Sequence, residues 1–316
     1  MSTGTALPPL ALVVVNYGSH KLLERNLQKV SSQTPGAAVV VVDSFSSTPE
    51  RRAVRALASR HGWDLVEPNE NVGFGKGMNL GVARAASGGA QSFLLLNPDA
   101  TIDNASISQL HESVALDPLL ISSPLVLRPD GSTWFDGADL YLDTGRTASV
   151  RKRASNPGSP TEPWLSGACL MVSAALWNEV GGFDEEYFLY WEDVDLSYRV
   201  TKAGGRLAVL RGAVAVHDEG GTHSPENVAR LDRRKSSTYY YYNIRNRLLF
   251  AARHLDDDSL SRWRSSSGRA AYDILLRGGK RQFLRPAAPL RAALHGHLDG
   301  LRIADGEARR RGTVGK

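Results

Sequence analysis

Short apolar runs alternate with helically spaced apolar residues along the first third of the chain. The runs are rich in Val and Leu, have the length of strands, and span residues 10–16, 37–43, 63–67 and 92–97. Continuous apolar runs of this length are typical of parallel strands that are buried on both faces. Between them, apolar residues spaced three and four apart predict helices over 20–30, 51–60 and 74–86. This alternation predicts an α/β fold with a mostly parallel central sheet flanked by helices.

The pattern is less regular in the rest of the chain. Residues 133–149 alternate weakly, and residues 151–163 have the composition of a basic loop rich in Ser, Pro and Gly. Further elements are expected over 170–180 (helix), 207–216 (strand) and 238–254 (helix). We therefore expect one α/β domain over residues 8–255 and a helical extension over residues 256–316.

Polar residues stand at or just beyond the ends of the predicted strands. Asn16, Asp43, Asn97 and Asp99 all occupy such positions. In open α/β sheets, ligands bind beyond the carboxyl ends of the strands. Each residue alone is more often a turn or cap residue. Together they predict a polar rim along one edge of the sheet.

The tripeptide Asn97-Pro98-Asp99 directly follows the run SFLLL. Pro98 ends the strand because it has no N–H to donate to the sheet. The turn presents one carboxylate and one amide at the expected ligand edge. That is enough protein oxygen for a hard divalent cation whose other ligands are phosphate and water. A plain turn is the alternative interpretation.

The segment around Glu192 and Asp193 combines three carboxylates within four residues with a run of aromatic side chains. Asp195 and Arg199 have the spacing of an ion pair on a helix that begins near Asp193. A helix start stabilises negative charge, which favours an ionised Asp193 that acts as a general base. The alternative is an acidic cap on a solvated helix, which the aromatic neighbours disfavour.

Several other kinds of site are excluded by their spacing. The glycine-rich NVGFGKGMN fits neither the dinucleotide fingerprint nor the P-loop, because Met78 and Gly77 stand where glycine and Ser or Thr are required. No zinc-protease or hydrolase-elbow motif occurs, and His217 alone is weak evidence for a ligand. The single cysteine, Cys169, has the setting of a core residue.

Composition is that of a globular protein, with 42% hydrophobic and 22% charged residues, so we expect neither disorder nor a disulfide scaffold. No apolar run approaches the ~20 residues that span a bilayer, and the N-terminus does not resemble a secretory signal. The net charge of +5 is uneven, because residues 259–316 hold 13 basic and 4 acidic residues. Basic tails favour nucleic acid, anionic membranes or phosphorylated ligands.

Seven segments resemble glycosyltransferase family 2, and its bacterial rhamnosyltransferase branch in particular. They are LALVVVNYGS, VVVVDSFSS, NVGFGKGMNLG, LLLNPDATI, LSGACLMVSAALWNEVGGFDEEYFLYWEDVDLSYRVTKAG, VAVHDEGGT and YYYYNIRNRLLF. Each motif is weak alone, whereas their order and spacing over residues 10–250 are specific. The resemblance implies a GT-A fold, inverting transfer of a sugar from a nucleotide donor, and Mg²⁺ or Mn²⁺ as cofactor.

The resemblance also implies roles for individual residues. Residues that hold the donor nucleotide are expected at Asn16, Tyr17, Asp43, Asn71, Gly73, Asn79 and Asn97. Asp193 is the expected catalytic base beside Glu192, and the metal is expected on Asp99 with His217 as a second contact. Contacts to the acceptor or the diphosphate are expected from Trp164, Gly167, Ala168, Trp191, Tyr241, Arg245 and Asn246. Many relatives have Asp where Asn97 stands, which disfavours chelation by two carboxylates in this turn.

By resemblance, the donor is dTDP-rhamnose and the acceptor a polyprenyl-diphosphate-linked saccharide of cell-envelope polysaccharide assembly. The expected location is the cytoplasmic face of the cell membrane, without a nucleic-acid partner, and a homo-oligomer stays open. Two alternatives are the same chemistry on a soluble small molecule and a non-catalytic nucleotide-binding protein. Intact Glu192 and Asp193 argue against the second alternative.

The basic tail separates the two acceptor hypotheses. Leu290, Leu294, Leu298 and Leu301 have helical spacing on one face, and basic residues surround the apolar positions at 275–285. A basic amphipathic helix of this kind is suited to an anionic membrane surface. The alternative is a helix whose leucines pack on the protein itself.

Overall fold

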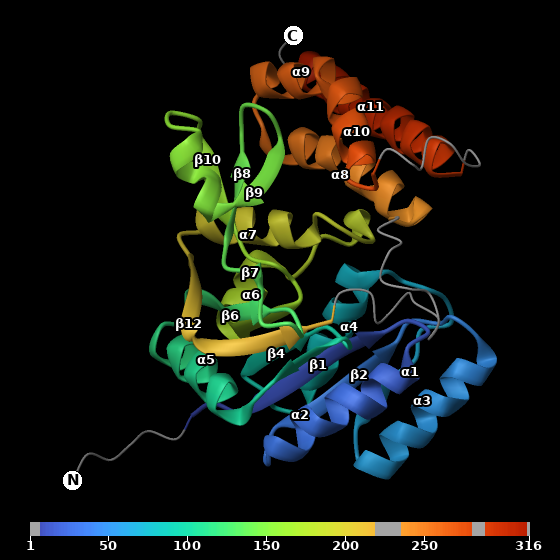
Figure 1. Ribbon diagram of the computed structural model, residues 1–316, viewed down its shortest axis with the longest axis vertical. Helices are drawn as coiled ribbons and strands as arrows, with labels where there is room; N and C mark the ends of the chain where they lie inside the picture. The colour runs from blue at the N-terminus through green and yellow to red at the C-terminus, as the bar shows by residue number, and fades with distance from the viewer. Residues whose placement is uncertain (1–6, 219–234, 280–287, 315–316) are drawn as a thin grey trace. The chain divides into compact units, whose positions relative to one another are not determined.

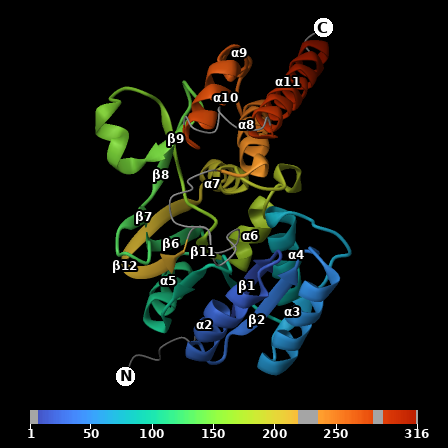
Figure 2. The same cartoon turned by 45° about the vertical axis from the view of Figure 1, so that its right-hand side comes forward.

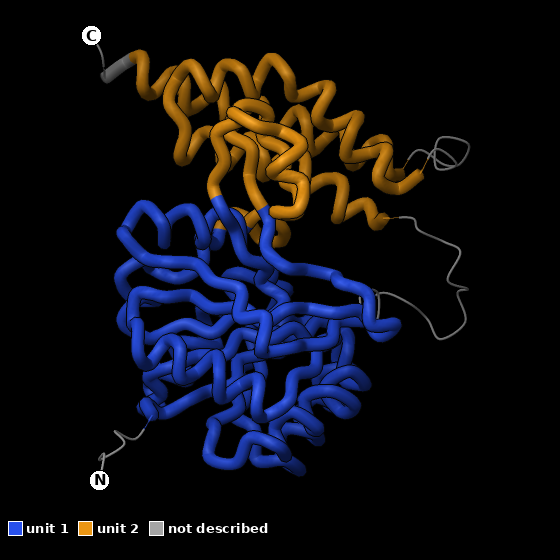
Figure 3. Tube along the Cα trace, turned by 60° about the vertical axis from the view of Figure 1, so that its left-hand side comes forward, with its two compact units in different colours: residues 1–138, 163–185, 192–224 blue, residues 139–162, 186–191, 225–316 orange. Residues whose placement is uncertain are grey.

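The computed structural model describes residues 7–218, 235–279 and 288–314. Contacts divide the chain into two compact units, which Figure 3 colours separately. The first unit comprises the described residues of Met1–Ala138, Pro163–Glu185 and Glu192–Ser224. The second comprises those of Asp139–Glu162, Glu186–Trp191 and Pro225–Lys316. The domain boundary expected after residue 255 stays a prediction.

The first unit is built on a nine-stranded sheet of the described residues, in the order β3-β2-β1-β4-β11-β6-β12-β5 with β7 beside β6 (Figure 1). Its strands are β1 (Leu10–Asn16), β2 (Ala38–Asp43), β3 (Asp64–Val66), β4 (Ser92–Leu96), β5 (Ala100–Ile102), β6 (Leu120–Leu127), β7 (Thr133–Phe135), β11 (Cys169–Ser173) and β12 (Arg206–His217). Strands β3, β2, β1 and β4 pair in parallel, as do β6 and β12, whereas β11 runs antiparallel to both of its neighbours. The prediction of a mostly parallel α/β sheet is confirmed.

Alternate residues of β1 explain why its sequence is apolar from Leu10 to Val15. Leu12 and Val14 belong to one buried cluster, and Val13 and Val15 belong to another. The first cluster takes side chains from η1 (Leu23–Leu27), α2 (Gln28–Gln33), α3 (Thr48–His61) and α5 (Asn104–Leu116). The second takes them from α4 (Phe74–Ser87), α6 (Ala174–Val180) and α7 (Glu192–Lys202). The sheet is therefore covered on both faces, as Figure 2 also shows for α2 and α4.

The glycine-rich stretch begins helix α4 and allows it to lie close to the sheet. A Cβ atom on Gly77 would lie 2.9 Å from a methyl of Val15, and one on Gly81 would lie 2.4 Å from a methyl of Val13. Real Cβ atoms do not approach other atoms so closely. These glycines therefore serve helix packing, which agrees with the absence of a P-loop pattern.

The helix expected over 170–180 is wrong in its first half. Residues Cys169–Ser173 form the buried strand β11, and only Ala174–Val180 are helical. The Oγ of Ser173 accepts a hydrogen bond from the Leu176 amide and thereby caps the helix. The expected basic loop also contains regular structure, namely the 3-10 helix η2 (Val150–Ser155) and the strand β10 (Thr161–Trp164).

The second unit is mainly helical. It contains α8 (Ser237–His254), α9 (Asp257–Ser265), α10 (Ser267–Leu276), α11 (Ala288–Val314) and most of a small sheet in which β8 (Ala138–Tyr141) lies between β10 and β9 (Arg146–Ser149). Helix α11 packs on α8 through small residues, because a Cβ atom on Gly296 would lie 2.4 Å from the Tyr241 carbonyl oxygen. No helix among the described residues has the length and hydropathy to cross a membrane.

Candidate functional site

The carboxyl ends of β1 and β2 bring Asn16 and Asp43 together. The two residues are register partners in the parallel pair, and the Asn16 Nδ2 donates to Asp43 Oδ1 at 3.0 Å. Both side chains are buried. Arg51, which the sequence analysis did not single out, donates from Nε to Asp43 Oδ2 at 2.9 Å. The predicted polar rim therefore begins with a paired, buried carboxylate.

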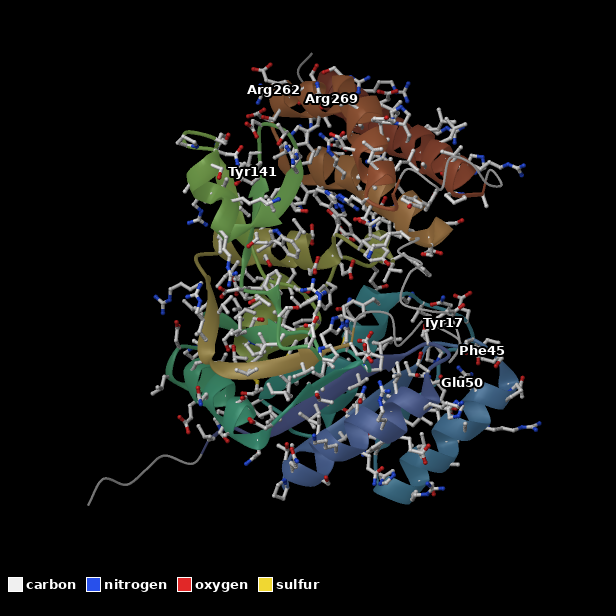
Figure 4. The ribbon with its side chains drawn as sticks, viewed as in Figure 1. Tyr17, Phe45, Glu50, Tyr141, Arg262 and Arg269 are labelled. Carbon is white, nitrogen blue, oxygen red and sulfur yellow. The ribbon has the colours of Figure 1, made fainter. Side chains whose placement is uncertain are left out.

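Tyr17 directly follows Asn16 at the end of β1 and is about half exposed (Figure 4). The Arg51 guanidinium lies 4.7 Å from the centroid of the Phe45 ring. Glu50 accepts hydrogen bonds from the His20 backbone amide and from Asn16 Nδ2. Aromatic faces beside buried polar groups are typical of a pocket for a flat, polar ligand such as a nucleobase.

Asn71 and Gly73 shape the start of α4. The Oδ1 of Asn71 accepts from the Ser44 hydroxyl and from the Gly73 amide, both at 3.0 Å. Gly73 has a φ of 79°, which glycine adopts without strain. Asn79 lies further along the helix and uses both ends of its amide on the Phe183 backbone. The Asn71 side chain thus links the start of α4 to the end of β2, whereas the Asn79 side chain links α4 to the segment after α6.

The Asn97-Pro98-Asp99 turn follows β4 as expected. The Oδ1 of Asp99 lies 2.9 Å from the Nε2 of His217, the last residue of β12. The two residues are 6% and 5% exposed. The ring centroids of His217 and Trp134 lie 4.3 Å apart. The structure therefore brings together the two predicted metal ligands, which are 118 residues apart in the sequence.

Asp99 and His217 supply only some of the ligands that a divalent cation needs. Among the described residues, no cluster of three or more His, Cys, Asp or Glu side chains could hold a metal. Both ring nitrogens of His217 are buried and make no hydrogen bond of good geometry to those residues, and Nε2 is the nitrogen that faces Asp99. A carboxylate oxygen and an imidazole nitrogen at one place suit Mg²⁺ or Mn²⁺ when phosphate and water complete the coordination.

Asp193 lies in the first turn of α7. Its Oδ2 accepts a hydrogen bond from the Gly167 amide at 3.0 Å, and its Oδ1 accepts one from the Val194 amide at 2.9 Å. Displacement of water by the surrounding protein nevertheless raises the pKa of Asp193 from 3.8 to about 6, since it outweighs these two donors. A carboxylate with this pKa is ionised at neutral pH and accepts a proton more readily than an ordinary aspartate.

Glu192 differs from its neighbour. It is buried, and its Oε2 has no hydrogen-bond partner among the described residues. Burial, followed by the charge of Asp193, raises the pKa of Glu192 well above its usual value. The pair therefore favours a protonated Glu192 beside an ionised Asp193, and two carboxyl groups whose protonation states differ can take different roles.

Asp195 and Arg199 form the expected ion pair on α7. The Nε of Arg199 donates to Asp195 Oδ2 at 2.7 Å, and Asp195 is completely buried. Arg199 also donates to the Val180 carbonyl at the end of α6 and to the Gly182 carbonyl just beyond it. These contacts fix α7 to the end of α6. Because Asp195 is committed to this ion pair, Asp193 is the one of the two aspartates that is available for chemistry.

The segment before β11 connects the base to the metal turn. The Gly167 amide donates to Asp193, and the Ala168 carbonyl accepts from the Asn97 amide at 2.9 Å. Trp164 begins this segment and packs beside Phe135, with ring centroids 5.5 Å apart. A Cβ atom on Gly167 would lie 3.2 Å from the Phe74 ring. The backbone of two residues thus holds the predicted base and the predicted metal turn in one arrangement.

Four predicted residues lie in the second unit. Trp191 is buried against Phe250, and Tyr241 donates to Asp299 at 2.9 Å. Tyr241 also lines a cavity of about 380 Å³ with His295, Leu298, Asp299 and Arg302. Arg245 pairs with Glu186, whereas Asn246 is 0% exposed, so its amide has no surface left for the predicted contact with the acceptor or the diphosphate.

The chain is similar to a known protein family and to known proteins. The model of "Glycosyltransferase like family 2" matches residues 8–241. An N-acetylglucosaminyl-diphospho-decaprenol L-rhamnosyltransferase of Mycobacterium tuberculosis is 27% identical over 259 residues, which cover 73% of this chain and 83% of that protein.

Solved structures show the same fold at low identity. The mannosyltransferase PcManGT of Pyrobaculum calidifontis, in complex with GDP-Man and Mn²⁺, is 18% identical with a TM-score of 0.55, over 96% of this chain and 88% of that chain. GalNAc-T7 with UDP, GalNAc and Mn²⁺ is 17% identical with a TM-score of 0.56. That match covers 83% of this chain but only 55% of the GalNAc-T7 chain.

Proposed function

Because this chain belongs to glycosyltransferase family 2 and has the GT-A fold, we propose that it is an inverting transferase that moves L-rhamnose from dTDP-rhamnose to a lipid-linked saccharide. The acceptor is a polyprenyl-diphosphate-linked sugar of cell-envelope polysaccharide assembly. The observation that carries this proposal is the Gly167–Ala168 segment, which holds Asp193 and the Asn97–Asp99 turn together. A base and a diphosphate site in one rigid arrangement are what a single displacement needs.

Asp193 accepts the proton of the acceptor hydroxyl as that oxygen attacks the anomeric carbon. The bond from this carbon to the diphosphate oxygen breaks on the opposite face, so the configuration inverts. The raised pKa of Asp193 suits this role, because a base with a pKa of about 6 is ionised at pH 7 and still takes a proton effectively. Gly167 keeps the carboxylate in place through its amide.

Asp99 and His217 would hold a divalent cation on the diphosphate of the donor. When bound, such a cation stabilises the negative charge that develops on the leaving nucleoside diphosphate. The buried Nε2 of His217, which faces Asp99 and makes no hydrogen bond of good geometry among the described residues, supports this assignment. The backbone amide of Asn97 donates to the Ala168 carbonyl. The Asn97 side chain takes no part in that bond, and we propose that it contacts the donor nucleotide.

We place the nucleobase of the donor nucleotide at the carboxyl ends of β1 and β2. Tyr17 offers an exposed aromatic face to the base, whereas the Asp43 carboxylate is buried and bonded to Asn16 and Arg51, so its proposed role is to fix this edge of the sheet beneath the base. The choice of L-rhamnose rests on the name of the Mycobacterium tuberculosis relative. The choice of a lipid-linked acceptor has the same basis.

Helix α11 supports binding to an anionic membrane surface. Its buried face consists of small residues such as Ala293 and Ala304, whereas Leu294 and Leu298 are 55% and 40% exposed. Two outward leucines on a basic tail are suited to an interfacial helix. The predicted apolar and basic positions at 280–287 lie outside the described residues. We therefore place the protein at the cytoplasmic face of the membrane.

Donor screening tests the proposed function without knowledge of the acceptor. The purified chain is mixed with dTDP-rhamnose, UDP-glucose, UDP-N-acetylglucosamine or GDP-mannose, and the released nucleoside diphosphate is measured. We expect slow hydrolysis with Mg²⁺ or Mn²⁺ that is fastest for dTDP-rhamnose. A preference for another donor would contradict the rhamnose assignment, and no release from any donor would contradict the enzymatic function.

A further inference from the structure

Three bulky residues just before Glu192 have left-handed backbone angles. The φ angles of Phe188, Tyr190 and Trp191 are 59°, 64° and 75°. Residues with a Cβ atom rarely adopt this region, and aromatic residues keep it only where their surroundings enforce it. The residues that enforce it therefore control how the chain enters α7.

The Asn246 side chain bonds this segment at three backbone carbonyls. Its Nδ2 lies 2.8 Å from the Tyr187 carbonyl oxygen, 3.0 Å from that of Leu189 and 2.7 Å from that of Tyr190. Asn246 has no exposed surface. The two N–H groups of this amide thus serve three backbone carbonyls, one of them through a shared hydrogen bond, and these carbonyls would otherwise lose these donors.

Arg245 orients the Asn246 amide. The Arg245 Nη1 donates to Asn246 Oδ1 at 2.6 Å and to the Glu186 carbonyl at 3.1 Å. A guanidinium can only donate and a carbonyl can only accept, so the amide has one consistent orientation. An aspartate at position 246 has the same shape but would face three carbonyl oxygens with an acceptor.

We propose that Asn246 is a positioning residue that, by holding the left-handed Tyr187–Trp191 segment, sets the first turn of α7 and the carboxylate of Asp193. The proposal rests on the proposed function, in which Asp193 is the base. Two backbone donors about 3 Å from the Asp193 carboxylate leave little tolerance for a shift. Misplacement of a reacting group by about 1 Å can cost about 10²-fold in rate.

The test compares Asn246→Asp with Asn243→Asp. Asn243 lies on the same helix, and its Nδ2 donates to the Tyr239 carbonyl within that helix, so it is a matched control. Hydrogen exchange measured by mass spectrometry follows the amides of residues 187–200 in each protein. Calorimetry measures the affinity for dTDP, and donor hydrolysis measures kcat, both well below the unfolding temperature. If Asn246→Asp lacks a cooperative unfolding transition, Asn246→Ser, which keeps one donor, replaces it.

In the Asn246 variant we expect faster exchange in residues 187–196, a kcat at least about tenfold lower, and an affinity for dTDP within about twofold of the wild type. The Asn243 variant should match the wild type in all three measurements. Unchanged exchange in the first turn of α7 would overturn the proposal, as would a loss of dTDP affinity equal to the loss of kcat. If the wild type hydrolyses no donor, the proposed function fails, and hydrogen exchange alone decides whether Asn246 holds this turn.

Discussion

Asp193→Asn removes the proposed base and keeps the shape of the side chain. The amide oxygen can still accept from the Gly167 or Val194 amide, so the first turn of α7 should be retained. Loss of a positioned general base costs about 10²–10⁴-fold in turnover. We therefore expect a loss of kcat in this range with unchanged donor affinity.

The raised pKa of Asp193 adds two expectations on pH. Turnover of the wild type should fall below pH 6, to about a tenth of its maximum at pH 5, because the protonated carboxyl cannot act as the base. A carboxyl whose folded pKa is raised favours folding below its unfolded pKa and loses that contribution as pH rises through the folded value. Ionised Asp193, whose pKa is raised to about 6, thus destabilises the fold at pH 8 by at most about 3 kcal/mol.

The assay combines kcat for donor hydrolysis with thermal unfolding at pH 5 and pH 8. Asp193→Asn should unfold at or above the wild-type temperature at pH 8, with a smaller gain at pH 5. Asp258→Asn, an exposed position in the first turn of α9, serves as the control: it should leave kcat unchanged and lower the stability by less than about 1 kcal/mol at both pH values, because it removes only a favourable charge at a helix start. A variant with more than a third of wild-type turnover would refute the assignment of the base.

The other predictions concern the metal, the packing and the tail. Asp99→Ala should abolish the dependence of dTDP affinity on Mg²⁺ or Mn²⁺; equal wild-type affinity with and without metal in calorimetry would exclude the site. Gly81→Ala should lower the stability by about 1–3 kcal/mol through overpacking, whereas Gly306→Ala, with open space around it, should raise it by about 0.5–1 kcal/mol in denaturant unfolding. Replacement of both Leu294 and Leu298 by Glu should prevent flotation with anionic liposomes while donor hydrolysis persists, and unchanged flotation would contradict the membrane assignment.

The strands that are buried on both faces were predictable from the sequence. The runs at β1, β2 and β4 are mostly apolar because alternate residues pack into two clusters, one on each face of the sheet. The same rule identifies β11 only in hindsight, since its five residues continue without a break into α6 and a short apolar run does not separate strand from helix. The antiparallel β5, whose three residues pair with β12, has no periodic signal of its own.

The sequence predicted those parts of the site whose chemistry requires particular residue types. Asp99 and His217 were expected to share a metal, and they lie within contact distance in the structure. Arg51 was missed, because its pairing with Asp43 follows from the packing of α3 rather than from any motif. The three bonds of Asn246 depend on a backbone conformation that Phe188, Tyr190 and Trp191 disfavour by themselves, so the sequence held no signal for them.

Transfer to a defined acceptor tests the central claim most directly. The purified chain is incubated with dTDP-rhamnose, Mg²⁺ and a synthetic N-acetylglucosaminyl-diphospho-polyprenol, and the product is analysed by mass spectrometry and NMR. We expect one added deoxyhexose whose anomeric configuration is opposite to that of the donor, and no product from Asp193→Asn. A product with retained configuration, or equal product from the variant, would contradict inverting transfer with Asp193 as the base.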